Sequence, residues 1–183
     1  MNNIIDIRLT ETGGELLTLT EVKTHLHITD TDNDTELTAL ITRCRKAVEN
    51  YCNVSLVNKT VEMIADLCEE WELPHGPVIG IAGVQTATSQ TGSAPTAYET
   101  QSSWSLSGLD FPKFAPSGAC FSLSGLGRYK LTYTVGYQVL PADLKLALLN
   151  EILFRYENRG DTGESLCPES EYLASPYKRL AFL

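Results

Sequence analysis

Apolar residues recur at helical spacing in the first third of the chain. Around residues 37–51 they return every three or four positions, as on one face of an α-helix: Leu37, Leu40, Ile41, Cys44, Ala47, Val48 and Tyr51. The polar face of this helix is expected to carry Arg43, Arg45, Lys46 and Glu49. A shorter helix is predicted over residues 19–27, because Thr18 and Glu21 stand three apart as a capping box.

The pattern changes from about residue 56, where apolar and polar residues begin to alternate as they do along a β-strand. Strands are predicted at residues 59–65, 77–84 and 128–135. Residues 85–127 are rich in Ser, Thr, Gly and Pro, which is typical of short strands joined by loops. The middle of the chain is therefore predicted to be an antiparallel β lobe.

Helical spacing returns after the last strand, where Pro141 and Asp143 suit a first turn. The helix predicted over residues 141–158 has one apolar face made of Leu144, Ala147, Leu148 and Ile152. A second apolar face is made of Leu146, Leu149, Leu153 and Tyr156. A helix that is apolar on two sides must be covered on both, by its own chain or by another subunit. The four residues of the second face are therefore candidate subunit-interface residues.

This order of elements favours an α+β fold with a helical core that holds two N-terminal helices and one long C-terminal helix. Residues 1–56 and 128–183 are predicted to form that core and a C-terminal tail. Residues 57–127 are predicted to form the inserted β lobe, which the strand at 128–137 closes. A chain of 183 residues can bury such a core without a disulfide or a metal.

The composition is that of a folded protein with an acidic surface. The chain is 43% hydrophobic and 20% charged, and its net charge is −9. A groove that grips phosphates needs clustered Lys and Arg, so an open DNA-binding groove is not favoured, whereas a wall that DNA slides past is compatible with this charge. The five cysteines form no Cys-x-x-Cys pair, which argues for reduced thiols. No stretch has the roughly 18 apolar residues of a membrane span.

Residues 30–36 (DTDNDTE) hold four carboxylates, three of them at alternate positions as in a calcium-binding loop. A calcium loop beginning at Asp30 needs Gly at its sixth position and Glu at its twelfth, where this chain has Thr35 and Ile41. Carboxylates that precede a helix satisfy free N–H groups and complement the helix dipole. The stretch is therefore predicted to start the second helix, with a cap within residues 32–34, and not to bind a metal.

No catalytic constellation is visible in the sequence, so neither an enzyme nor a cofactor is expected. Gly-x-Ser-x-Gly, Walker and His-Glu-x-x-His motifs are missing, and His25, His27 and His75 lack the spacing of metal ligands. One alternative function stays open, that of a ligand- or carbohydrate-binding module. Its stacking platform would come from the aromatic residues of the β lobe and its borders: Tyr98, Trp104, Phe111, Phe114, Tyr129, Tyr133 and Tyr137. Aromatic residues in alternating strands are more often core or interface residues.

Several short segments stand in a distinctive order along the chain. They are Leu17–Ile28, the acidic turn, the helix end Ala47–Cys52, Thr134–Tyr137 followed by Leu140–Ala147, and Tyr156–Arg159. This ordered set resembles the head–tail connector (adaptor) proteins of long-tailed bacteriophages. The resemblance covers about residues 16–53 and 128–180, and the stretch from 60 to 127 is similar to the β insertion of the larger family members. His27 departs from the family, which often has Arg at this position.

The resemblance implies a structural protein of the virion neck, assembled in the host cytoplasm. Members of this family form a ring, commonly a dodecamer, beneath the portal after packaging, and pass the DNA channel on toward the stopper or tail-completion protein. The C-terminal arm of the family docks on the portal, so the resemblance implies portal contacts at Tyr177, Lys178, Arg179 and Leu180. DNA would pass through the ring without specific binding, which the acidic charge fits.

Overall fold

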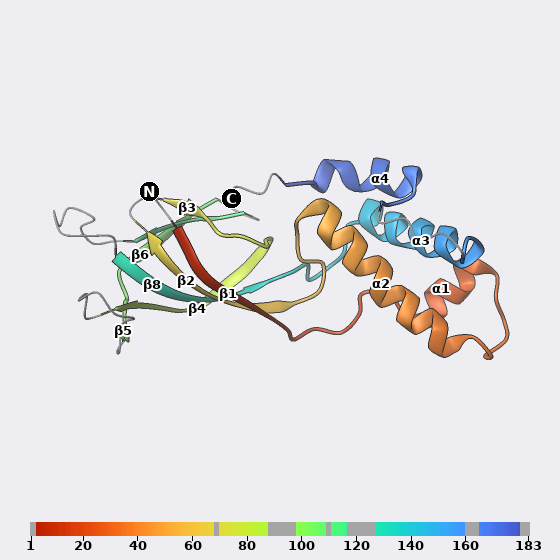
Figure 1. Cartoon of the computed structure of the whole chain (residues 1–183), viewed down its shortest axis with the longest axis horizontal. Helices are drawn as coiled ribbons and strands as arrows, with labels where there is room; N and C mark the ends of the chain where they lie inside the picture. The colour runs from red at the N-terminus through yellow and green to blue at the C-terminus, as the bar shows by residue number, and fades with distance from the viewer. Residues whose placement is uncertain are drawn as a thin grey trace. The chain divides into compact units, whose positions relative to one another are not determined.

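The computed structural model describes residues 3–67, 70–87, 98–108, 111–116, 127–159 and 165–179. The chain divides into two compact units, one mainly of strands and one mainly of helices (Figure 1). Met1–Gly13 and Asn58–Gly136 form the β unit, and Gly14–Val57 and Tyr137–Leu183 form the helical unit. The fold class is α+β, and every strand pairing among the described residues is antiparallel.

The β unit contains two sheets in its described part. The five-stranded sheet has the order β1 (Asn3–Glu11), β2 (Lys59–Leu67), β8 (Gly127–Val135), β4 (Val78–Ala87) and β5 (Tyr98–Thr100). The three-stranded sheet has the order β3 (Trp71–Glu72), β7 (Lys113–Pro116) and β6 (Trp104–Ser107). The three strands that the alternating pattern predicts are present as β2, β4 and β8.

The inner face of the five-stranded sheet follows directly from the alternation in β2 and β8. Val61 lies opposite Tyr133 and Met63 lies opposite Leu131, and all four side chains are buried. The residues between them face outward and are partly exposed, as in an antiparallel sheet with one solvated face. The core of this unit therefore lies against one face of the sheet.

The aromatic residues of the β unit are largely core residues. Phe114 and Tyr133 are fully buried, and Tyr129 is buried beside them. Trp104 packs against the same cluster, with its ring centroid 6.3 Å from that of Phe114. These rings pack on one another, as is usual for aromatic residues in alternating strands, and this packing does not favour the alternative of a stacking platform.

The first strand, β1, is absent from the sequence-based prediction, which assigns residues 1–56 to the helical core. In the structure β1 pairs with β2, so the first thirteen residues belong to the β unit, as do residues 128–136. Ile5, Ile7 and Leu9 alternate with polar residues as in a strand, and the pairing is irregular only between Ile4 and Asp6, where β1 holds one extra residue.

The helical unit contains α1 (Leu19–Leu26), α2 (Asp34–Cys52), α3 (Ala142–Glu157) and α4 (Pro168–Ala174), followed by a 3₁₀ turn, η1 (Ser175–Tyr177). The predicted capping box is confirmed at the start of α1. The Glu21 backbone N–H donates to Thr18 Oγ1 at 3.2 Å, and the Thr18 backbone N–H donates to Glu21 Oε2 at 2.9 Å. The helix ends at His27, whose φ of 55° is left-handed.

The acidic stretch 30–36 leads into α2, as the sequence predicts. The N-cap is Asn33, which makes no side-chain capping hydrogen bond. Asp34, in the first turn, accepts a hydrogen bond from Lys23 Nζ at 2.6 Å. Among the residues that the structure describes, no group of three or more His, Cys, Asp or Glu side chains could hold a metal ion. No described helix has the length and apolar character needed to cross a membrane.

Candidate interaction surfaces

Two buried polar networks fix the helices of the helical unit. In the first, Arg45 donates from Nε to Glu15 Oε2 at 2.8 Å and from Nη1 to Glu49 Oε2 at 2.9 Å. Glu49 Oε1 also accepts the backbone N–H of Leu56 at 2.8 Å. The expected place of Arg45 and Glu49 on the exposed polar face is wrong, since the chain segments on either side of α2 fold over them. Arg43 and Lys46 are exposed as predicted.

The second network attaches α4 to α3. Glu151 is fully buried and accepts hydrogen bonds from Arg155 Nε at 2.5 Å and from the backbone N–H of Cys167 at 2.9 Å. Ser170 Oγ donates to the backbone carbonyl of Ala147 at 2.7 Å. These bonds set the position of α4 along α3, because Glu151, Cys167 and Ser170 are buried and would otherwise lose their hydration without compensation.

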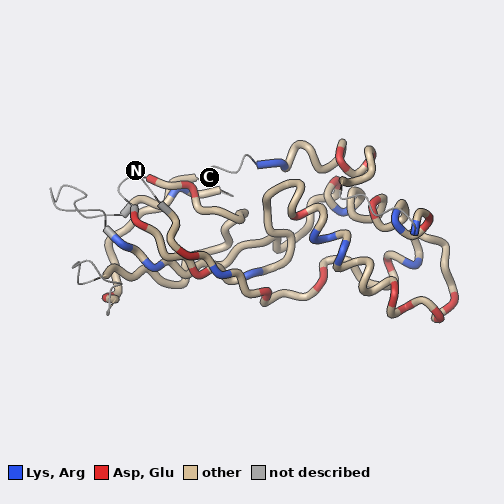
Figure 2. The backbone as a smooth tube through the Cα atoms, viewed as in Figure 1, with Lys and Arg blue, Asp and Glu red and all other residues tan. Residues whose placement is uncertain are grey.

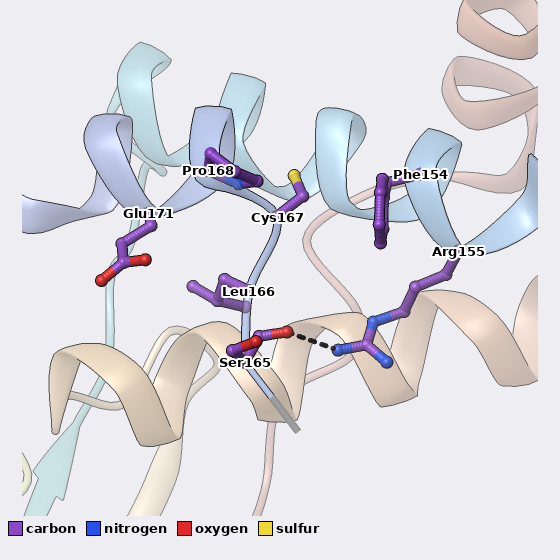
Figure 3. Close-up of a pocket in the computed structure, with 7 residues that line it drawn as sticks. All are labelled: Phe154, Arg155, Ser165, Leu166, Cys167, Pro168 and Glu171. Carbon is purple, nitrogen blue, oxygen red and sulfur yellow. Dashed lines mark hydrogen bonds between the residues drawn. The ribbon is translucent and has the colours of Figure 1, made fainter. Parts of the chain in front are cut away.

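A pocket of about 290 Å³ opens between the end of α3 and the beginning of α4 (Figure 3). It is lined by Phe154, Arg155, Ser165, Leu166, Cys167, Pro168 and Glu171. Arg155 Nη2 donates to the carbonyl of Ser165 at 3.4 Å, and Figure 3 shows this bond at one side of the pocket. Burial raises the pKa of the Cys167 thiol, which makes it a poor nucleophile. The lining thus offers space for a side chain of a partner and no nucleophile–base pair.

The two faces of α3 differ in burial. Leu144, Ala147 and Ile152 are fully buried, whereas Leu146 on the opposite side is 43% exposed. The other candidate interface residues, Leu149, Leu153 and Tyr156, are partly exposed. The chain therefore covers one apolar face of the helix and leaves the second partly open, as an interface with another subunit would require.

The candidate portal-binding residues follow α4. The backbone N–H of Arg179 donates to the carbonyl of Cys52 at 2.8 Å, and Lys178 Nζ lies 4.3 Å from the ring centroid of Tyr51. Burial, with the Asp143 carboxylate as a second cause, raises the pKa of Tyr177. These three residues are thus held against the helical unit, and Leu180 lies outside the described residues.

The sequence of the chain has a match among protein families. The family model described as head completion protein matches residues 15–165. The chain belongs to the head completion protein family. This membership confirms the resemblance to phage head–tail connector proteins, and the family is one of structural virion proteins.

Solved structures share the fold of this head completion protein. A chain in the neck of an empty gene transfer agent (GTA) particle, computed with C6 symmetry, aligns with a TM-score of 0.71 at 19% identity, over 96% of this chain and 97% of the other. A chain in the virion of the native GTA particle gives a TM-score of 0.69 at 20% identity, over 96% and 97% of the two chains. A chain in the neck of the native particle, computed with C12 symmetry, gives 0.67 at 20% identity and the same coverage. No curated protein sequence matches the chain.

Proposed function

We propose that this head completion protein assembles as a ring in the neck of a virion, between the portal and the stopper or tail-completion protein. The ring, a dodecamer on the portal, extends the DNA channel after packaging. The family match over residues 15–165 carries the proposal. Chains of the same fold in GTA necks computed with sixfold and twelvefold symmetry support it, since a ring of identical subunits has such a symmetry.

The open face of α3 supports the formation of subunit contacts. Leu146, Leu149, Leu153 and Tyr156 form an apolar strip that the chain itself covers only in part. Burying such a strip against a neighbour contributes about 25 cal/mol for each Å² of apolar surface removed from water. We assign these residues to the contact between neighbouring subunits of the ring.

The segment after α4 supports a portal contact. Lys178 is exposed although its ammonium group lies over Tyr51, and Tyr172, on the outward side of α4, is 80% exposed. An aromatic ring next to basic side chains is typical of a protein interface. We assign Tyr177, Lys178, Arg179 and Leu180 to portal binding.

The net charge of −9 supports passage of DNA without binding. Like charges repel, so an acidic wall leaves phosphates mobile in the channel. The β unit is proposed to be a lobe added to the helical unit, which carries the ring and portal contacts.

Light scattering tests the assembly directly. The purified chain is mixed with the portal protein of the same particle, and the mass of the complex is measured before and after the substitution Leu146→Glu. We expect a mass of the portal plus a ring of copies for the wild type, and loss of the ring for Leu146→Glu. Val139→Glu is the matched control, because Val139 is an 83% exposed apolar residue outside α3. A wild-type chain that stays monomeric and does not bind the portal would contradict the proposal.

A further inference from the structure

The outward faces of α2 and α3 point in opposite directions. The two helices pack on each other through their buried faces, Leu37, Ile41, Cys44 and Val48 on α2 and Leu144, Leu148 and Ile152 on α3. At 100° per residue, the side chains turned away from this contact form one line on each helix. The line on α2, here called the α2 stripe, is Ala39, Arg43, Lys46 and Asn50, all exposed. The line on α3, here called the α3 stripe, is Leu146, Asn150, Leu153 and Glu157, and its two ends are exposed.

The chemistry of the two stripes is complementary. The α2 stripe carries two positive charges, and Figure 2 shows positive residues in the middle of α2. The α3 stripe is apolar except for Asn150 and the carboxylate of Glu157. With the described residues, Arg43, Lys46 and Glu157 form none of the ion pairs of the structure. Arg and Lys can lay their aliphatic stems on leucine side chains while the charged end reaches a carboxylate.

The two helices run in opposite directions, so one contact between them shows which residues of the two stripes lie at the same height along the helix axes. Arg159 Nη1 lies 3.6 Å from Glu36 Oε2, so the start of α2 is beside the end of α3. Counting seven residues inward along both helices from this pair brings Arg43 to the level of Ile152, next to Leu153. Glu157 is five residues from that level, roughly 7.5 Å along the helix axis, which an arginine and a glutamate side chain can span together.

We infer that the α2 stripe of one copy docks on the α3 stripe of the next copy in the ring. Arg43 pairs with Glu157 of the neighbour. The stems of Arg43 and Lys46 cover Leu153 and Leu146. Because the stripes are different surfaces on opposite sides of the helix pair, the contact is head-to-tail, and a repeated head-to-tail contact forms a ring when its rotation closes. The inference rests on the proposed ring and names the two surfaces that build it.

A charge swap tests this pairing. Three variants are compared with the wild type: Arg43→Glu, Glu157→Arg, and both together. The protein concentration at half-assembly is measured by mass photometry in the presence of portal protein. Each single variant is expected to raise that concentration about tenfold or more, because it places like charges together, and the double variant to return it to within about threefold of the wild type. Glu169→Arg is the matched control, since Glu169 is exposed on α4 and lies in neither stripe.

A photo-crosslinking amino acid at position 46 gives a second readout that does not depend on charge. Crosslinked peptides that join position 46 of one chain to residues 146–157 of another support the inference. Crosslinks that join only two α2 helices contradict it. In the charge-swap experiment, loss of assembly for Glu157→Arg but not for Arg43→Glu also contradicts it, because this result indicates a twofold contact between two α3 helices. A wild type that assembles while the charge swap restores nothing overturns this inference alone. A wild type that never assembles with the portal overturns the proposed function.

Discussion

The buried carboxylate of Glu151 accepts the backbone N–H of Cys167 at 2.9 Å and thereby ties the beginning of α4 to the middle of α3. The same carboxylate accepts from Arg155 Nε, so one side chain satisfies two donors. The proposed portal-binding residues follow α4 directly. The position of the proposed portal-binding residues therefore depends on a buried side chain that is not itself part of the portal-binding surface.

Replacing Glu151 should destabilise the fold strongly. Glu151→Ala leaves the Cys167 N–H and the Arg155 guanidinium without this acceptor in a buried site, so we expect a loss of about 3–5 kcal/mol in the free energy of unfolding. Urea denaturation followed by circular dichroism measures it. Glu169→Ala, on the exposed side of α4, is the control and should change stability by less than about 0.5 kcal/mol. If Glu151→Ala lost as little stability as the control, the buried network would contribute almost nothing to the free energy of unfolding.

The contact between Glu21 and Lys145 should make stability depend on pH. The Lys145 ammonium, 2.6 Å from Glu21 Oε1, and then the Thr18 backbone N–H lower the pKa of Glu21 from 4.5 to about 2. A lowered pKa stabilises the fold above the unfolded value, and this stabilisation is lost as the pH falls from about 4.5 to about 2.

Both side chains of that pair are about 40% exposed, so water weakens the effect to at most about 1 kcal/mol. Thermal melts of the wild type and Glu21→Gln between pH 7 and pH 2 measure it. We expect the wild type to melt higher at pH 7 and the difference to vanish near pH 2. A difference that stays constant over this range would contradict the assignment.

The buried thiols should be unreactive in the folded protein. Burial raises the pKa of Cys44 to about 12 and that of Cys52 to about 11, so almost no thiolate is present at pH 8. We expect a thiol reagent such as DTNB to label neither residue in buffer and both in urea. The measurement uses the Cys68→Ser, Cys120→Ser background, because those two residues lie outside the described part of the structure. Cys167, the third remaining thiol, is also buried, so three thiols in all should react in urea. Fast labelling in buffer would show that α2 opens readily.

Trp104→Ala should lower the free energy of unfolding of the β unit. Trp104 packs on the core of the β unit with its ring 6.3 Å from Phe114, so we expect a loss of about 2–3 kcal/mol, somewhat below that of a fully buried aromatic residue. Chemical unfolding measures the loss, and a glycan array tests the alternative role. If the variant kept its stability and lost binding to a glycan that the wild type binds, the alternative function as a ligand-binding module would be supported instead.

The sequence predicts best the elements that have a regular period or a local signal. The capping box at Thr18, the apolar spacing of α2 and the alternation in β8 each depend on residues close together in the chain, so local chemistry is sufficient. Strand β1 is the exception: its residues 5–10 do alternate, but its place in the β unit depends on pairing with β2, far later in the chain.

The candidate surfaces are predictable in part. The second apolar face of α3 is visible in the sequence, since the regular spacing of apolar residues along one helix is enough to predict it. The burial of Arg45 depends on Glu15, thirty residues earlier in the chain, and no local pattern reports such a contact. The opposition of the α2 and α3 stripes likewise emerges only when the two helices are packed together.

The most direct test of the account is electron microscopy of the purified chain bound to the portal of the same particle. The account predicts a closed ring of this chain on the portal, with the helical unit at the contacts between copies and an open channel along the axis. A chain that decorates the portal as separate monomers, or that never appears on it, would contradict the central claim.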